Sequence, residues 1–328
     1  RAKQAAACLA RGVRRCRILS FAKLRKQVRR NKKFLPLLIM TLPGMAYLII
    51  NNYIPMYGIT LAFREVDYSK GIFNGDWIGF ENFKFLFQTK DAWLITKNTL
   101  LYNGAFILVN TIVALIVAIM LSEITSKGFL RFSQTVIILP YIISIIIVSY
   151  LVYAFFSVDT GFVNNTILPM LGMEKISWYN EPKYWPFILT FVNAWKNVGY
   201  LSVIYFASII GIDKQFYEAA ELDGASKWQQ IRTITLPSIT PTICMMVLLA
   251  VGRIFYSDFG LFYQVPMNSG PLVSATNVID TYVYRGLMQL NDIGMSSAAS
   301  AYQALVGCAL VITANLVVRK ISPENALL

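Results

Sequence analysis

Three carboxylates, Glu218, Glu221 and Asp223, lie close together in one short segment and are the acidic residues best placed for chemistry. We do not expect these carboxylates to be catalytic. The chain contains no histidine, which excludes a histidine general base, a Ser-His-Asp triad and histidine metal ligands. It also lacks a P-loop and a C-x-x-C pair, so we expect neither nucleotide nor metal binding in this chain. The carboxylates therefore indicate contact with a partner, and the chain is not predicted to be an enzyme.

The residues around these acids predict two short helices joined by a turn. Strong helix formers over residues 217–222 predict the first helix. Its acids lie near the N-terminal end, where the helix dipole stabilises negative charge. Gly224 permits a sharp turn, and Ser226 can cap a second helix over residues 227–234. Pro237 then opens the next helix. Exposed acids and aromatic side chains on such a pair suit docking to another protein, and a solvated loop between two helices is the alternative interpretation.

The composition of the whole chain indicates a membrane protein. Of its 328 residues, 56% are hydrophobic and 14% are charged, whereas soluble domains are about 45–50% apolar and about 25% charged. A helix needs about 20 apolar residues to cross a bilayer. The apolar segments that meet this length are residues 35–60, 98–122, 133–156, 185–210, 238–258 and 296–318. We therefore predict an all-α, polytopic membrane protein with six transmembrane helices, the third kinked at Pro140.

The net charge of +13 comes from the N-terminal segment, because residues 1–33 contain 13 Lys and Arg and no acids. The positive-inside rule places this segment in the cytoplasm. Six spans then place both termini and the loop 211–237 inside. We predict a basic tail over 1–33, a transmembrane domain over 34–320 and a C-terminal tail over 321–328. Attraction to anionic membrane lipid explains such a tail better than nucleic-acid binding, which we do not expect.

The loop 211–237 resembles the EAA loop of ABC importer permeases. The match consists of Glu218-Ala219-Ala220, Asp223-Gly224-Ala225, Ile234 and Leu236-Pro237. Further similar segments are residues 53–58, 79–83, 98–100, 139–141, 161–164, 195–196 and 281–285. Together they cover about 34–318, and they resemble polysaccharide-type (LplB-like) carbohydrate permeases related to the maltose-transporter (MalF-like) permease.

The resemblance implies a type I ABC importer permease (MetI-like) fold in the bacterial plasma membrane. It implies transport of an oligosaccharide or polysaccharide fragment with several partners. These are a second homologous permease that completes a heterodimer, two nucleotide-binding ATPase subunits and an extracytoplasmic solute-binding protein, which is a lipoprotein in some systems. The chain itself would hold no cofactor and no metal, since ATP and Mg²⁺ would bind the partner ATPase.

The resemblance also implies roles for residues of the loop. Glu218 would contact a basic group of the ATPase, and Asp223 would brace the loop. Gly224 would let the two short helices approach. The small residues that would pack the coupling helix are Ala219, Ala220 and Ala225.

Polar side chains within spans are costly and usually face a cavity or the interior of the bundle. A sugar pathway combines aromatic faces with groups that bind hydroxyls. The predicted pathway residues are Asn193, Trp195, Lys196, Asn197 and Tyr200 in span four, Arg253 and Tyr256 in span five, Tyr153 in span three and Asn110 in span two. Alternatively, Lys196 joins helices by pairing with a carbonyl or carboxylate. Arg253 also has two alternative interpretations: its side chain reaches the outer membrane interface, or it forms an ion pair with Asp258.

Two other functions remain open at this point. An ion-gradient-driven carrier or a channel would use the loop 211–237 as a structural element only. An ABC permease for a non-sugar solute, such as a peptide or a lipid, would keep the assembly and change the cargo.

Overall fold

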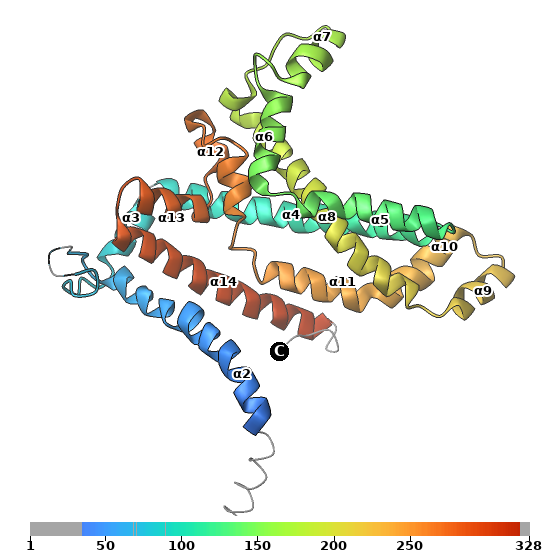
Figure 1. Cartoon of the computed structure of the whole chain (residues 1–328), viewed down its shortest axis with the longest axis horizontal. Coiled ribbons are helices and arrows are strands. Elements are labelled where there is room, and N and C mark those ends of the chain that lie inside the picture. The colour runs from blue at the N-terminus through green and yellow to red at the C-terminus, as the bar shows by residue number, and fades with distance from the viewer. Residues whose placement is uncertain (1–34, 68, 70, 89, 322–328) are drawn as a thin grey trace, which may run out of the picture. The chain divides into compact units, whose positions relative to one another are not determined.

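The computed structural model describes residues 35–321 except residues 68, 70 and 89. The predicted tail 1–33, and the predicted C-terminal tail apart from Ile321, lie outside the described residues. The chain divides into a unit of residues 1–59 and a unit of residues 60–328, which we describe separately. In the described part, the regular structure is helical except for one antiparallel bridge between Arg64 and Trp77 (Figure 1).

The described part of the first unit is a long apolar helix. It begins as α2 (Leu35–Leu48), passes through a π-helical turn (Ile49–Tyr53) and continues as a 3-10 helix (Pro55–Phe63) that runs into the second unit. Apolar side chains are exposed all along it, and Met40 is 77% exposed. A helix that is apolar on every side suits a lipid environment.

The second unit contains the other helices. They are α3 (Glu81–Gln88), α4 (Lys90–Ser122), α5 (Lys127–Ile142), α6 (Ile145–Phe156), α7 (Leu168–Met170), α8 (Trp185–Ile210), α9 (Lys214–Leu222), α10 (Lys227–Gln230), α11 (Leu236–Val251), α12 (Val273–Thr276), α13 (Ile279–Met288) and α14 (Ile293–Ile321). Among the described residues, 5 helical segments are long and apolar enough to cross a membrane, and the bent pair α5–α6 gives up to 6. Each predicted span therefore has a counterpart.

The third predicted span, 133–156, is not one kinked helix. It is broken into α5 and α6, which meet at an angle of 95°. The break follows Ile142, where Ile143 and Ser144 take extended backbone conformations (ψ 132° and 141°). Pro140 lies inside α5 rather than at the bend. The bend leaves carbonyl groups at the C-terminal end of α5 without helical partners, and these need other donors.

The fifth predicted span, 238–258, also ends early. Its helix α11 stops at Val251, and residues 252–258 are not helical. The prediction that Arg253 and Tyr256 lie on a helix is therefore wrong. Apolar residues continue to Phe255, which explains why composition alone overestimated the length of the helix. The Phe255 carbonyl is instead satisfied by the side chain of Gln303 on α14, at 2.7 Å.

One buried cluster of the second unit forms where α8 packs between α4 and α5 (Figure 1). On α4, Ala114 and Ala118 are fully buried against α8 residues such as Tyr205. Small residues allow helix backbones to approach closely in membranes. A very close approach of two helices occurs at Gly199 of α8, where an added Cβ would lie 1.9 Å from the carbonyl oxygen of Ile137.

We expect Gly199→Ala to destabilise the second unit, because its methyl group would collide with the α5 backbone. Overpacking of this kind costs about 1–3 kcal/mol. Thermal unfolding of the purified protein in detergent measures the effect. Gly104→Ala is the matched control, since a Cβ at this helical glycine of α4 meets no atom within 4 Å. Equal melting temperatures for the two variants would contradict the proposed α5–α8 contact.

Candidate functional site

The predicted helix–turn–helix is present, and we call residues 213–237 the knuckle. Its first helix, α9, starts earlier than predicted because Asp213 caps it, accepting a hydrogen bond from the Gln215 N–H at 3.0 Å. The second helix starts where predicted. Ser226 accepts from the Gln229 N–H, and Gln229 in turn accepts from the Ser226 N–H at 2.7 Å. This reciprocal capping box fixes the start of α10.

The turn between the two helices is a Schellman motif. The Ala225 N–H donates to the Ala220 carbonyl at 2.9 Å, and the Gly224 N–H donates to the Glu221 carbonyl at 3.0 Å. Gly224 has a φ of +79°, which the motif requires and which glycine adopts without strain. An added Cβ at Gly224 would meet no atom within 4 Å. The glycine therefore provides the backbone conformation and not a close approach of two helices.

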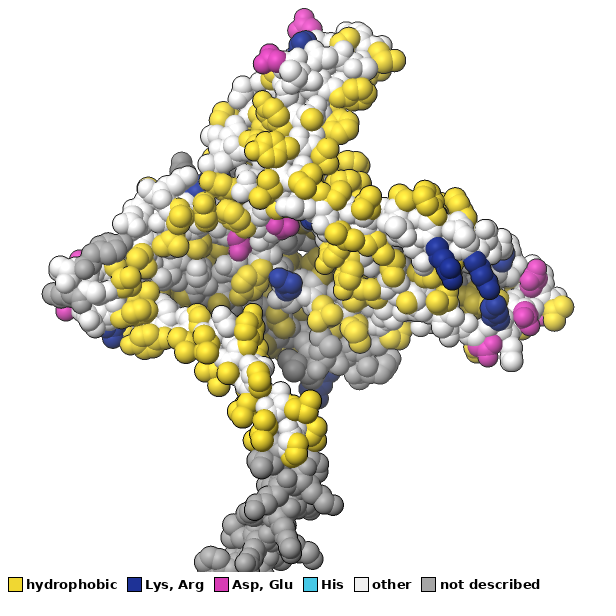
Figure 2. Space-filling view, viewed as in Figure 1, with side chains coloured by type: hydrophobic (Ala, Val, Ile, Leu, Met, Phe, Trp, Pro, Cys, Tyr) yellow, Lys and Arg dark blue, Asp and Glu magenta, His cyan; other side chains and the backbone are white. Residues whose placement is uncertain are grey.

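The knuckle presents a mixed apolar and acidic surface, which we call the docking surface: Phe216, Glu218, Leu222, Asp223 and Trp228. Leu222 is 90% exposed and Trp228 is 69% exposed. Within residues 35–321, the carboxylates of Glu218 and Asp223 form no ion pair or hydrogen bond. Acidic side chains lie at the end of the second unit that carries α9, where Lys and Arg side chains also gather (Figure 2). Large exposed apolar side chains next to unpaired acids indicate a protein partner.

The predicted loop residues thus have distinct positions. Glu218 and Ala219 are exposed, whereas Ala220 and Ala225 are half-buried and joined through their backbones. The backbone of Asp223, rather than its carboxylate, takes part in the turn. The predictions did not include Leu222, although an apolar residue beside three acids on a short exposed helix was a usable signal.

Five of the predicted pathway residues line one polar cavity of about 210 Å³. They come from α4, α8 and the non-helical segment 252–258. These five are Asn110, Asn193, Asn197, Arg253 and Tyr256. The wall also includes the polar residues Asn103, Thr111 and Tyr205. Its remaining members are apolar: Phe106, Ile107, Leu201, Met246 and Ala250. We call it the polar cavity after its amide groups and Arg253. Asn103 precedes Asn110 by seven residues, a helical spacing that places both on one face of α4.

The amide groups of this cavity are only partly used by the protein. Asn110 donates to the Asn193 side-chain oxygen at 2.8 Å, and Asn197 donates to the Asn193 backbone carbonyl at 2.9 Å. Asn103 donates to the Ser257 hydroxyl at 3.1 Å. The buried side-chain oxygen of Asn110 has no hydrogen-bond partner in the part of the chain described. Such groups can both donate to and accept from the hydroxyls of a ligand.

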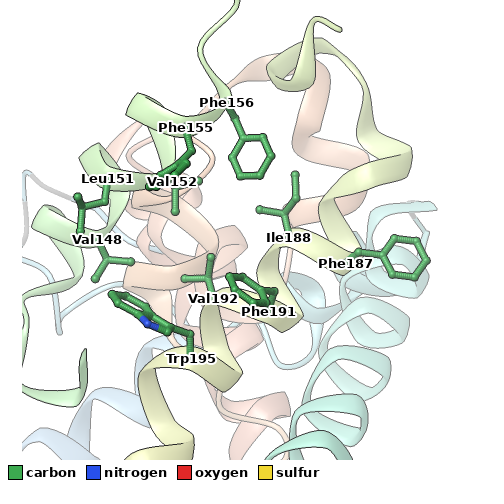
Figure 3. A pocket seen from close by; sticks show the side chains of 10 residues that line it. All are labelled: Val148, Leu151, Val152, Phe155, Phe156, Phe187, Ile188, Phe191, Val192 and Trp195. Carbon is green, nitrogen blue, oxygen red and sulfur yellow. The ribbon is translucent and has the colours of Figure 1, made fainter. Parts of the chain in front are cut away.

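Trp195 lies elsewhere, in an apolar groove of about 580 Å³ between α6 and α8. Figure 3 shows its indole among valine, leucine, isoleucine and phenylalanine side chains. Tyr200 stacks on Tyr141 of α5, with ring centroids 5.0 Å apart. Tyr153 of α6 packs on Tyr179, at 5.5 Å. These three aromatic rings are therefore not gathered around the polar cavity.

Lys196 joins two helices, as its alternative interpretation proposed. Its ammonium group donates to the carbonyl oxygens of Tyr141 at 3.1 Å and Ile143 at 2.5 Å. The Pro140 carbonyl oxygen lies at 3.5 Å. These are carbonyls exposed by the α5–α6 bend, and a cation at a helix C-terminus also interacts favourably with the helix dipole. Arg253, in contrast, forms no ion pair with Asp258 in the described residues.

Membrane-spanning helices around a polar cavity, with a docking surface at one end, define a membrane transport component. The chain matches the family described as "Binding-protein-dependent transport system inner membrane component" over residues 110–321, and it belongs to this family. It is therefore a transport component and not an enzyme. It is 33% identical to the polygalacturonan/rhamnogalacturonan transport system permease protein YteP of Bacillus subtilis, over 88% of this chain and 89% of YteP. It is also 30% identical to protein LplB of Bacillus subtilis, over 88% of this chain and 90% of LplB.

Solved structures agree with this assignment. A bacterial ABC transporter involved in import of the acidic polysaccharide alginate contains a chain that is 34% identical and superimposes with a TM-score of 0.81. The match covers 89% of this chain and 97% of that one. A second structure of a bacterial alginate ABC transporter, in complex with its alginate pentasaccharide-bound periplasmic protein, matches with a TM-score of 0.80. The predicted MetI-like all-α fold is confirmed.

We expect Lys196→Met to lower the stability of the protein, because two carbonyl groups of α5 and the Ile143 carbonyl in the bend would lose their shared donor. Hydrogen bonds between membrane helices are worth about 0.6–2 kcal/mol, and thermal unfolding in detergent measures the loss. Lys196→Arg should restore most of it. A Lys196→Met variant that unfolds at the wild-type temperature would contradict this role.

Proposed function

We propose that the chain is a permease subunit of an ATP-dependent ABC importer that moves an oligosaccharide or polysaccharide fragment into the cell. The observation that carries this proposal is the asparagine-lined, partly open cavity between α4, α8 and the segment 252–258. Amide groups suit sugar hydroxyls, and a polar cavity at membrane depth is costly unless a pathway needs it. The names of YteP and of the alginate transporter support a carbohydrate as the cargo.

The docking surface of the knuckle is proposed to bind an ATPase subunit. Leu222 and Trp228 would enter apolar hollows of the partner, and Glu218 would pair with a basic group. The hydrogen-bonded turn makes the knuckle a stiff element, so a movement of the ATPase would be passed to α11. Tyr217 supports this transmission, because its hydroxyl lies 2.9 Å from that of Thr235, just before α11. ATP and Mg²⁺ would remain on the partner.

The remaining partners follow from the same assembly. A second homologous permease would cover part of the exposed apolar surface, and a solute-binding protein would deliver the sugar from outside. The knuckle and both termini would then lie in the cytoplasm of a bacterial cell, with the protein in the plasma membrane. The charge of residues 1–33 supports this orientation.

We expect Glu218→Lys to abolish ATP-driven uptake, because it places a cation against the basic group of the ATPase. The complete transporter in liposomes, assayed for uptake of labelled oligosaccharide and for ATP hydrolysis, measures the loss, and membrane insertion should be normal. The matched control is Glu174→Lys, the same reversal at an exposed position far from the knuckle in sequence, which should leave uptake unchanged. Wild-type coupling in Glu218→Lys would contradict the role of the docking surface.

An ion-gradient-driven carrier is the competing function, and removal of the ATPase separates the two. Vesicles containing the permeases but no ATPase subunits should take up no sugar, even with an imposed ion gradient. Uptake driven by the gradient alone would contradict the ABC importer proposal.

A further inference from the structure

The non-helical segment after α11 lies near the middle of the membrane. Gly307 is the central residue of α14 (Ile293–Ile321). An added Cβ at Gly307 would lie 3.7 Å from the Phe255 Cβ and 3.8 Å from the Tyr256 ring. At 1.5 Å per residue, this position is about 21 Å from each end of α14. Irregular backbone at this depth is tolerated only inside protein or beside a water-filled cavity. The segment meets the second condition, since Arg253 and Tyr256 form part of the cavity wall.

Arg253 brings a positive charge to this position. Among the described residues that line the polar cavity, it is the one with a charged side chain. It is exposed and has no ion pair within residues 35–321. Its location near the midpoint of α14 also argues against a side chain that merely reaches the outer interface. An unpaired guanidinium at membrane depth is costly, so its presence indicates a function.

The two carboxylates at the segment 252–258, those of Asp258 and of Asp280, which contacts Ser257, are engaged elsewhere. Asp280 accepts from the Ser257 N–H at 2.7 Å and from the Gln303 side chain at 3.2 Å. Asp258 accepts from the Leu261 N–H at 3.2 Å. Neither carboxylate lines the cavity. The cavity therefore combines one free cation with several amide groups.

We propose that Arg253 recognises the carboxylate of an acidic sugar, so that the transporter selects uronate-containing oligosaccharides over neutral ones. This inference rests on the proposed function and names its substrate class. A guanidinium binds a carboxylate through two parallel hydrogen bonds and keeps its charge at every physiological pH. The amides of Asn110, Asn193 and Asn197 would bind the hydroxyls of the same or the next sugar unit. Arg253 thereby acts as a specificity-determining residue.

The test compares a matched pair of substrates in the complete transporter. The pair is an oligogalacturonate or an alginate oligosaccharide and the same compound with its carboxyl groups reduced to alcohols. Uptake into liposomes and stimulation of ATP hydrolysis are measured for the wild type and for Arg253→Met. Arg253→Lys retains the charge but not the two-point geometry. Arg131→Met, at an exposed arginine on α5, is the matched control. Thermal unfolding verifies that each variant is folded.

The wild type should prefer the acidic sugar, and Arg253→Met should reduce that preference by about 10- to 100-fold, the range expected for one lost hydrogen-bonded charge. Uptake of the reduced sugar should be retained, and Arg253→Lys should be intermediate. The inference is overturned if the wild type accepts only neutral sugars. It is also overturned if Arg253→Met keeps the wild-type preference or loses both sugars equally. If no sugar of either kind is taken up, the proposed function itself fails.

Discussion

The absence of water in the membrane interior is the constraint on which this structure depends, because every backbone group there must find a partner within the protein. A straight helix meets this requirement with its own backbone hydrogen bonds. The two breaks described above, at the α5–α6 bend and after α11, leave backbone carbonyl groups that need donors from other helices. At the α5–α6 bend, Lys196 supplies a donor for carbonyls at the end of α5. After α11, Gln303 supplies one for Phe255. Both donors come from a different helix, so each break ties neighbouring helices together.

The same constraint separates structural polar groups from functional ones. Lys196 is polar and lies at membrane depth, yet its hydrogen bonds are made to the protein itself. Asn110 and Arg253 lie in a cavity where part of their binding capacity is free. A polar side chain within a span therefore indicates a binding site only when its partners are missing. The knuckle differs from these sites. The backbone groups of its turn are hydrogen-bonded within the knuckle, and the side chains of its docking surface are free to bind a partner.

Local features of the fold were predictable from the sequence. Six apolar segments gave the spans, and Ser226, Gly224 and Pro237 gave the knuckle, because caps and turns depend on neighbouring residues. The 95° bend and the early end of α11 were not predictable, since the groups that satisfy them are distant in sequence. The pathway was predictable in part. Side chains spaced three and four apart on α8 span about 100° of its surface, so Asn193 and Asn197 reach the cavity while Lys196 and Tyr200 face α5.

The central claim is that the asparagine-lined cavity is the path of the sugar. Thiol labelling tests it most directly, using Asn197→Cys in a chain whose four native cysteines are replaced. In the complete transporter, a water-soluble maleimide should label this position, and transported sugar should slow the labelling. Phe191, which is 71% exposed, lies on the apolar surface of α8. The thiol of Phe191→Cys should react only with a membrane-permeant reagent, and sugar should not change its labelling rate. An Asn197→Cys thiol that is inert, or whose labelling ignores the sugar, would contradict the account.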